Sequence, residues 1–136
     1  MKFILLSVLF CALLFADKLC DIKFDNGLRI EKLPHANTPK SRMEGLSNLE
    51  DVGIGMIFVW DKADRLSFWM KDTRVALSIG FFDDNMELFQ IDDMKPHSLD
   101  VHHSKKEAKF ALELKHGDFE KHNITIGTKI IKLDCK

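Results

Sequence analysis

Large side chains alternate with small or polar ones over much of this chain. The pattern is clearest at residues 75–82 and 110–114, and it recurs near both ends, at residues 22–31 and 129–133. A period of two places successive side chains on opposite faces of extended backbone, which is typical of β-strands. Together these segments predict a mainly β domain, an antiparallel sandwich or partly closed barrel of about seven strands with one short helix.

The first alternating segment contains a hairpin signal. Asn26-Gly27 separates two short alternating runs, and both residues tolerate the positive φ that tight hairpin turns require. We expect the second strand to end at Leu33-Pro34, because proline cannot donate a hydrogen bond to a neighbouring strand.

A short helix is predicted directly after this hairpin. Thr38 is a suitable N-cap, and Pro39 suits the first helical position, where its missing N–H is not needed. Met43 and Leu46 are three residues apart and so share a face. We expect this helix to be held by packing through that face.

The most aromatic segment is Gly55–Thr73, which contains both tryptophans. Its pattern predicts strands at Met56–Trp60 and Leu66–Lys71, joined by a charged turn at Asp61–Arg65. The second strand leads directly into the polar residues Lys71–Thr73. An apolar strand with a polar end makes this segment the first place to look for a ligand site.

Length and charge limit the possible classes of protein. A chain of 136 residues supports one domain, and 46% hydrophobic with 30% charged residues is ordinary for a globular protein. The net charge of −1 provides no broad attraction to nucleic acid or to an anionic membrane. We therefore expect no nucleic-acid partner.

The first residues have the pattern of an export signal. Lys2 precedes residues 3–16, which are apolar except for Ser7 and are too few for the roughly 18 apolar residues that span a bilayer. Cleavage between Ala16 and Asp17 would leave residues 17–136 as a single β domain in the periplasm or outside the cell. The alternative is an uncleaved signal, which would be the chain's only attachment to a membrane.

The cysteine pattern agrees with export. Removing residues 1–16 leaves Cys20 near the start and Cys135 near the end, and an even count in an exported chain favours a disulfide. The termini of a compact domain are often close together, which makes this pairing feasible. Two free thiols remain the alternative if the chain is not exported.

Several segments form a recognisable set: Ala36–Pro39, Arg42, Gly45-Leu46, Gly55–Phe58, the distinctive Ser67–Thr73, and, later in the chain, Phe110–Leu114 and Asn123–Thr128. Together they resemble the signature of an exported bacterial and archaeal family, domain of unknown function 192. The resemblance implies a mainly β, sandwich-like domain with no assigned activity.

The chain also departs from the family pattern. Ser78 stands where the family has an aspartate, Asp72 replaces the usual asparagine, and Ser47 replaces a methionine. If the family aspartate takes part in chemistry, that chemistry is lost here or its acid has moved to Asp72.

A candidate ligand-binding face lies on the strand at residues 66–71. Alternation places Trp69 on the same side as two polar neighbours, and aromatic rings stack on sugars or planar ligands, while a lysine attracts anions. The strand at residues 75–82 has a face of small residues that could complete a shallow pocket. The candidate ligand-binding residues are Ser67, Trp69, Lys71, Asp72, Thr73 and Ser78. The alternative is structural: small residues at 76, 78 and 80 make room for the tryptophan ring, and Lys71-Asp72 caps a turn.

A histidine-rich loop is the second candidate site. His97, Asp100, His102 and His103 could offer the three ligands that a catalytic zinc needs. Adjacent histidines on extended backbone point to opposite sides, however, and the spacing matches no zinc motif. A solvated loop is the alternative, so we assign no metal or cofactor from the sequence.

These observations favour an exported, non-catalytic ligand-binding or accessory module of the cell envelope. Its partner would be a small polar ligand, a glycan or an envelope protein. The alternative is a small hydrolase or metalloenzyme that uses the His97–His103 loop with Asp72 or Asp100. A structural element of the envelope, without any pocket, is a third possibility.

Overall fold

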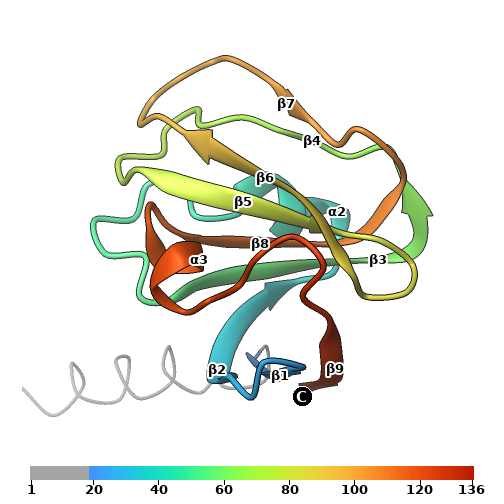
Figure 1. Ribbon diagram of the computed structural model, residues 1–136. Helices are drawn as coiled ribbons and strands as arrows, with labels where there is room; N and C mark the ends of the chain where they lie inside the picture. Colours follow the sequence, from blue (N-terminus) through green and yellow to red (C-terminus); the bar gives the residue numbers. More distant parts are fainter. Residues whose placement is uncertain (1–18) are drawn as a thin grey trace, which may run out of the picture.

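The computed structural model describes residues 19–136, which form nine strands and two short helices (Figure 1). The strands are β1 (Leu19–Phe24), β2 (Arg29–Ala36), β3 (Gly55–Asp64), β4 (Ser67–Phe68), β5 (Leu77–Phe82), β6 (Leu88–Met94), β7 (His102–His103), β8 (Ala108–Lys115) and β9 (Ile130–Cys135). The helices are α2 (Pro39–Glu44) and α3 (Asp118–Lys121). The expected export signal and its cleavage point between Ala16 and Asp17 lie outside the described residues. Within residues 19–136, no helix has both the length and the apolar character needed to cross a bilayer.

Seven strands form one curved sheet in the order β6-β5-β8-β3-β2-β1-β9, and β4 pairs separately with β7. Every pairing in the large sheet is antiparallel except that of β2 with β3. An isolated bridge between Glu87 and Lys129 brings the two ends of the sheet together beside β6. The mainly β, partly closed architecture predicted from the alternating segments is confirmed.

The predicted hairpin joins β1 to β2. Gly27 adopts φ of 89°, and its N–H donates to the carbonyl of Phe24, which closes the turn. The side-chain oxygen of Asn26 accepts from the N–H of Leu28, at 2.9 Å. The Asn26 side chain therefore stabilises the turn by a hydrogen bond, and Gly27 allows the positive φ that the turn requires.

The predicted end of β2 at Leu33-Pro34 is wrong, because the strand continues to Ala36. Pro34 lies opposite Leu19 on β1, and the next residue, His35, already pairs in parallel with Ile57 on β3. The proline occupies the position at which β2 changes partner, where its missing N–H is tolerated.

The hairpin predicted within Gly55–Thr73 is also wrong. β3 continues through the charged residues to Asp64 and pairs with β8 and β2, whereas Ser67 and Phe68 pair with His103 and His102. A register shift between Val59 and Asp64 lets the polar residues of β3 reach solvent while its backbone stays extended.

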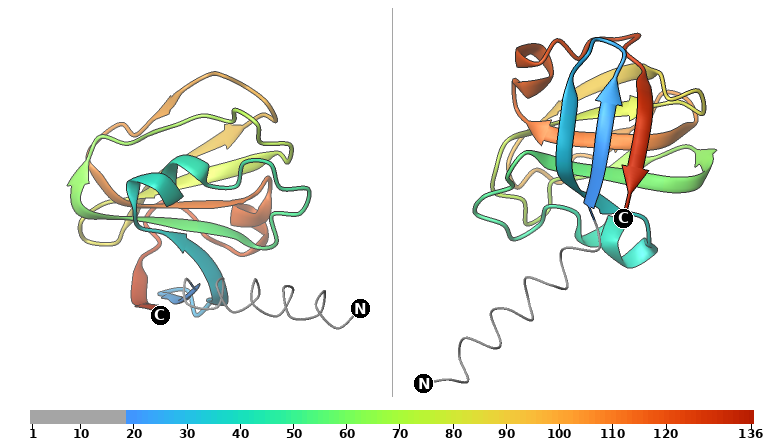
Figure 2. Two further views of the ribbon diagram at one scale, coloured as in Figure 1. Left: turned by 180° about the vertical axis from the view of Figure 1, so that it is seen from behind. Right: turned by 90° about the horizontal axis from the view of Figure 1, so that it is seen from below.

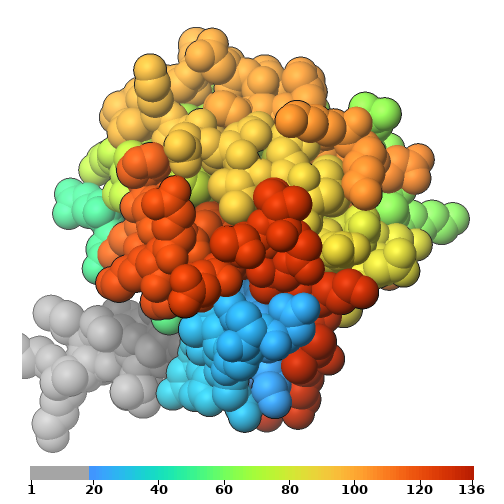
Figure 3. Space-filling model, in the orientation of Figure 1, coloured from blue at the N-terminus to red at the C-terminus, as the bar shows by residue number. Residues whose placement is uncertain are grey.

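The two helices lie on opposite faces of the sheet. α3 is on the near side in Figure 1, and α2 comes to the front when the molecule is turned by 180° (Figure 2). Figure 3 shows how the C-terminal residues, in orange and red, cover the face on which α3 lies. One core cluster contains Phe82 and Phe119 on the α3 side, and a second contains Phe58 and Phe81 on the α2 side.

The beginning of α2 is confirmed, but its predicted packing face is not. Thr38 caps the helix in a reciprocal arrangement with Ser41, and Pro39 follows it. Met43 is 83% exposed, whereas Leu46, beyond the end of the helix, is buried. The helix is anchored through Leu46 and through Arg42, whose contacts are described below.

Candidate ligand-binding site

A pocket of about 300 Å³ lies on the α2 face of the sheet. The sheet contributes Phe58 and Glu113, α2 and the residues after it form one side, and the segment around β4 forms the other. A volume of this size is at the lower end of the range for small-molecule sites.

Glu113 is the chemically unusual residue of this pocket. It lies on β8, where its neighbours across the sheet are Met56 on β3 and Ile79 on β5. Burial raises the pKa of its carboxyl group to about 8. Within residues 19–136, no hydrogen bond to its side chain is formed and no cation lies within 4.0 Å of it. At neutral pH the carboxyl group therefore holds its proton and can both donate and accept a hydrogen bond.

Aromatic rings form the apolar part of the pocket. The Phe58 and Phe68 rings meet edge to face with centroids 5.0 Å apart, and Trp60 contacts Phe68 in the same manner at 6.0 Å. Trp69 lies at the rim with half of its surface exposed. These rings are fixed by contacts with one another, so the apolar wall is largely preformed.

Arg42 joins α2 to the pocket wall. Its guanidinium carbon is 4.9 Å from the centre of the Trp60 ring, and one of its nitrogens donates to the carbonyl oxygen of Val59 at 3.0 Å. A guanidinium has five N–H donors, so donors are left over beyond the bond to Val59. Lys71 is placed similarly over Trp69, with its ammonium nitrogen 5.4 Å from the ring centre.

The structure brings three of the six sequence-predicted site residues to this pocket. Ser67, Trp69 and Thr73 line it. Lys71 contacts the rim tryptophan without lining the cavity, and Asp72 is an exposed turn residue with φ of 56°. The carbonyl of Asp72 accepts from the N–H of Asn48 at 2.8 Å, which ties the two sides of the pocket together.

Ser78 is not part of the pocket. On β5 its neighbour Ile79 pairs with Glu113, so Ser78 points to the opposite face of the sheet. Its hydroxyl donates to Asp93 Oδ1 at 2.8 Å, and the same carboxylate lies 3.4 Å from His116 Nδ1. The carboxylate stands between the serine and the histidine, so the histidine cannot activate the serine as a nucleophile.

Gly80 on β5 does not make room for Trp69 either. A Cβ at Gly80 would lie 2.8 Å from the Phe119 ring and 2.9 Å from Leu88. Glycine is therefore required at position 80 by the packing of Phe119 on the other face of the sheet, and the prediction that position 80 makes room for the Trp69 ring is wrong.

The candidate metal ligands of the histidine loop do not come together within residues 19–136. His103 Nδ1 lies 2.9 Å from Ser67 Oγ, and His102 Nδ1 lies 3.5 Å from Asp92 Oδ2, so the adjacent rings have different partners. Within residues 19–136, neither His97 nor Asp100 belongs to a group of three potential metal ligands.

Three important pocket residues were missed from the sequence: Arg42, Trp60 and Glu113. Glu113 had a visible signal, because it is the one charged residue in the otherwise apolar stretch from Phe110 to Leu114. Arg42 was noticed only as part of the family resemblance, and its contact with Trp60 could not be read from the sequence because it depends on how α2 crosses β3.

Comparisons with known proteins support the fold. The model of the family DUF192, described as Uncharacterized ACR, matches residues 22–131. No curated protein matches the sequence. Two solved structures are similar: a candidate transcription regulator from Sinorhizobium meliloti 1021 (21% identical, TM-score 0.74, 85% of this chain and 93% of that chain covered) and a protein of unknown function from Novosphingobium aromaticivorans DSM 12444 (23% identical, TM-score 0.74, 84% of each chain covered). At these identities the likeness shows a shared fold alone.

Proposed function

The chain belongs to the uncharacterised family DUF192, and from its pocket we propose that it is an exported, non-catalytic module that binds a small polar ligand with an apolar ring face. A saccharide unit, free or at the end of a glycan, is the ligand class we favour.

The observation that carries this proposal is the carboxyl group of Glu113, which faces the pocket among apolar side chains. A polar group in such surroundings requires a hydrogen-bond partner, and a ligand hydroxyl in the pocket can supply one. In its protonated form Glu113 can donate to one ligand oxygen and accept from another hydroxyl. Hydroxyl groups, which also donate and accept, complement it better than a purely apolar ligand does.

The aromatic wall supports the choice of a saccharide. The rings of Trp60 and Phe68, with Trp69 at the rim, offer apolar surface against which the C–H face of a sugar ring can stack. The spare N–H groups of Arg42 can donate to ring or hydroxyl oxygens at the pocket edge. A pocket of about 300 Å³ suits one or two sugar units rather than a long chain.

Charge argues against a cationic ligand. Arg42 lies over Trp60 and Lys71 lies over Trp69, so each tryptophan already has a positive group over its ring. A second cation would meet repulsion at both positions. A neutral ligand fits this arrangement with Glu113 protonated.

Export and a place in the cell envelope are supported by two features. One is the signal-like pattern of the first sixteen residues, and the other is the disulfide between Cys20 and Cys135, a bond that persists mainly in oxidising compartments. Fractionation of cells that produce the full chain, with mass measurement of the exported product, would test both export and cleavage after Ala16.

Calorimetric titration with a panel of mono- and disaccharides, nucleotides and small anions would test ligand binding. We expect binding of one saccharide class, weakened up to about 10-fold by Trp69→Ala, since aromatic contacts contribute about 0.5–1.5 kcal/mol. Glu113→Gln, which keeps the shape of the side chain, should alter the affinity as well. Leu99→Ala removes an exposed apolar side chain outside the pocket and serves as the control. Equal binding by wild type and both pocket variants would exclude the pocket as the site.

A second candidate function is hydrolysis, which one observation favours. Ser67 Oγ and His103 Nδ1 are 2.9 Å apart at the pocket rim, the arrangement of a nucleophile and its base. Within residues 19–136, however, no carboxylate lies within 4.0 Å of the His103 ring to orient it, and Ser67 is exposed. Turnover of an activated ester that is lost in both Ser67→Ala and His103→Ala would support hydrolysis, and turnover unchanged in Ser67→Ala would exclude it.

A further inference from the structure

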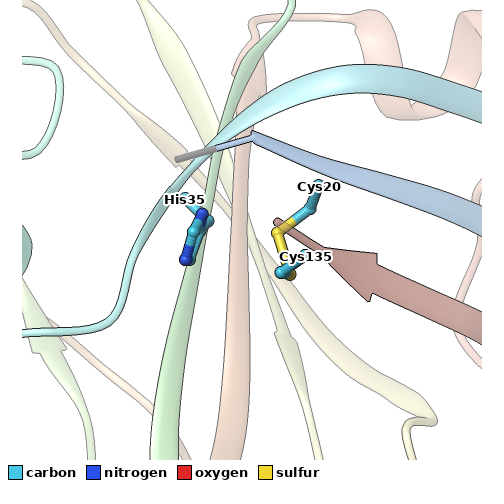
Figure 4. A group of neighbouring side chains, drawn as sticks. All are labelled: Cys20, His35 and Cys135. Carbon is cyan, nitrogen blue, oxygen red and sulfur yellow. A yellow bond between two sulfur atoms is a disulfide. The ribbon is translucent and has the colours of Figure 1, made fainter. Parts of the chain in front are cut away.

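Three potential metal ligands meet at the end of the sheet formed by β1, β2 and β9. Cys20 and Cys135 are directly opposed in the pairing of β1 with β9, and a disulfide joins them. His35 lies beside this disulfide on β2 (Figure 4). The ligand atoms of the three residues all lie within 4.8 Å of one another, and none of the three lines the pocket under α2.

The imidazole of His35 has unused bonding capacity. Its Nδ1 atom is buried, and it has no hydrogen-bond partner within residues 19–136, where no other side-chain nitrogen or oxygen is in this condition. Buried polar atoms are nearly always paired, so this nitrogen requires an explanation. The sulfur atoms of Cys20 and Cys135 lie within 4.8 Å of a ring nitrogen of this histidine.

We propose that Cys20, Cys135 and His35 form a Zn²⁺ site when the disulfide is reduced. Two thiolates and one imidazole nitrogen are ligands that zinc prefers, with Zn–S near 2.3 Å and Zn–N near 2.0–2.1 Å. Tetrahedral bonds of these lengths place the ligand atoms roughly 3.5–4 Å apart, which is inside the 4.8 Å spread seen here. The fourth position is left for water. This inference goes beyond the proposed function and does not depend on it.

The conversion requires a two-electron reductant, which we take to be a dithiol. The dithiol transfers two electrons and two protons to the sulfurs, so that the bond between Cys20 and Cys135 breaks and a new disulfide forms within the reductant. Zinc then replaces the two thiol protons, which are released to solvent, and the neutral imidazole of His35 coordinates through a ring nitrogen. The same three residues would thus hold either a disulfide or a metal ion.

Binding can be measured on the full chain, reduced with a phosphine that does not chelate metals. The phosphine takes an oxygen atom from water and becomes a phosphine oxide, while both sulfurs become thiols. We expect one Co²⁺ per reduced chain with an intense thiolate charge-transfer band, displaced by Zn²⁺, and no band in the oxidised protein. His35→Ala should lower the affinity about 10-fold or more, whereas His97→Ala, at an exposed position, should leave it unchanged.

Thermal unfolding provides a second readout that does not depend on colour. Zinc in excess should raise the Tm of the reduced wild type, or restore its folded circular-dichroism signal if reduction unfolds it, because a metal that binds only the folded state stabilises it. Absence of a charge-transfer band together with no effect of zinc on folding would overturn the proposal. Equal metal affinity in wild type and His35→Ala would also overturn it, because the histidine would then not be a ligand.

Discussion

Glu113 on β8 lies directly opposite Met56 on β3, so the nearest cross-strand neighbour of this buried carboxyl group on that side is a thioether and not a cation. Ile79 occupies the equivalent place on β5. A carboxylate in such surroundings has lost its hydration without gaining an ion-pair partner, and it therefore holds its proton. The pocket floor is polar at neutral pH but uncharged.

This pairing predicts the pH dependence of stability. The pKa of Glu113 is raised from 4.5 to about 8 in the folded protein, so between these values the folded state binds more protons than the unfolded state. The free energy of unfolding should then fall as pH rises through this window, by at most about 5 kcal/mol. Glu113→Gln cannot ionise and should lack this component. Urea unfolding at pH 5, 6, 7 and 8 would measure the difference between the two proteins.

Glu107→Gln is the matched control, because Glu107 is an exposed acid close to the start of the same strand. Its unfolding free energy should follow that of wild type at every pH. If the curves for Glu113→Gln and wild type were parallel, Glu113 would be ionised in the folded protein.

Arg42→Ala should destabilise the fold by about 1–3 kcal/mol. The change removes the hydrogen bond to the Val59 carbonyl and the contact with the Trp60 ring, which together fasten α2 to β3. Lys40→Ala on the same helix removes only an exposed pair with Glu44 and should change the unfolding free energy by less than about 0.5 kcal/mol. Similar losses for both variants would mean that Arg42 contributes only as a surface charge.

Gly80→Ala should destabilise the fold by about 1–3 kcal/mol through overpacking. The new methyl group would lie 2.8 Å from the Phe119 ring, which comes from the other face of the sheet than the binding pocket. Phe119→Leu in the same chain should recover part of the loss by making space, and a double-mutant cycle would measure that coupling. If a double-mutant cycle instead showed an interaction free energy between Gly80→Ala and Trp69→Ala, it would contradict the packing of Gly80 against Phe119.

Reducing the disulfide in metal-free buffer should lower the free energy of unfolding by up to about 4–5 kcal/mol. Cys20 and Cys135 are 115 residues apart, and closing so long a loop strongly restricts the unfolded chain. Urea unfolding with and without a phosphine reductant would measure the effect. A Cys20→Ala, Cys135→Ala double variant should match the reduced protein and should no longer respond to the reductant.

His35→Leu should leave the oxidised protein as stable as wild type or raise its unfolding free energy by about 1 kcal/mol. The change removes a buried nitrogen that has no partner within residues 19–136, and replacing such a group with an apolar one is neutral or favourable. His97→Leu, at an exposed position, should have no effect. A loss of several kcal/mol in His35→Leu would show that the imidazole is paired, for example through a bound water molecule.

Local sequence signals were sufficient for the first turn and for the start of α2, but not for the end of β2 or the extent of β3. Asn26-Gly27 identified the first turn and Thr38-Pro39 the start of α2, because each acts on its own neighbouring backbone. The mainly β fold and the Cys20–Cys135 pairing could also be predicted, since an alternating pattern and an even cysteine count restrict the possibilities strongly.

Which strands pair with one another could not be predicted in the same way. Alternation told us which side chains share a face, but it did not tell us that Ser67 and Phe68 pair with the histidine loop instead of with β3. The position of Ser78 was misjudged for the same reason: its face is set by the register of β5 on β8, a contact between segments distant in sequence. Glu113 becomes unusual only once β3, β5 and β8 together bury it.

The bond between Cys20 and Cys135 also determines how the domain responds to mechanical load. A pulling force applied at the two ends of the domain passes from β1 to β9 through a covalent bond, so the intervening residues are not stretched. The sheet would keep its shape, and its pocket, under forces that unzip hydrogen-bonded strands. Reduction would transfer the same force to the hydrogen bonds between β1 and β9. When these break, the extension measured for a single molecule would increase by the length of the chain between Cys20 and Cys135.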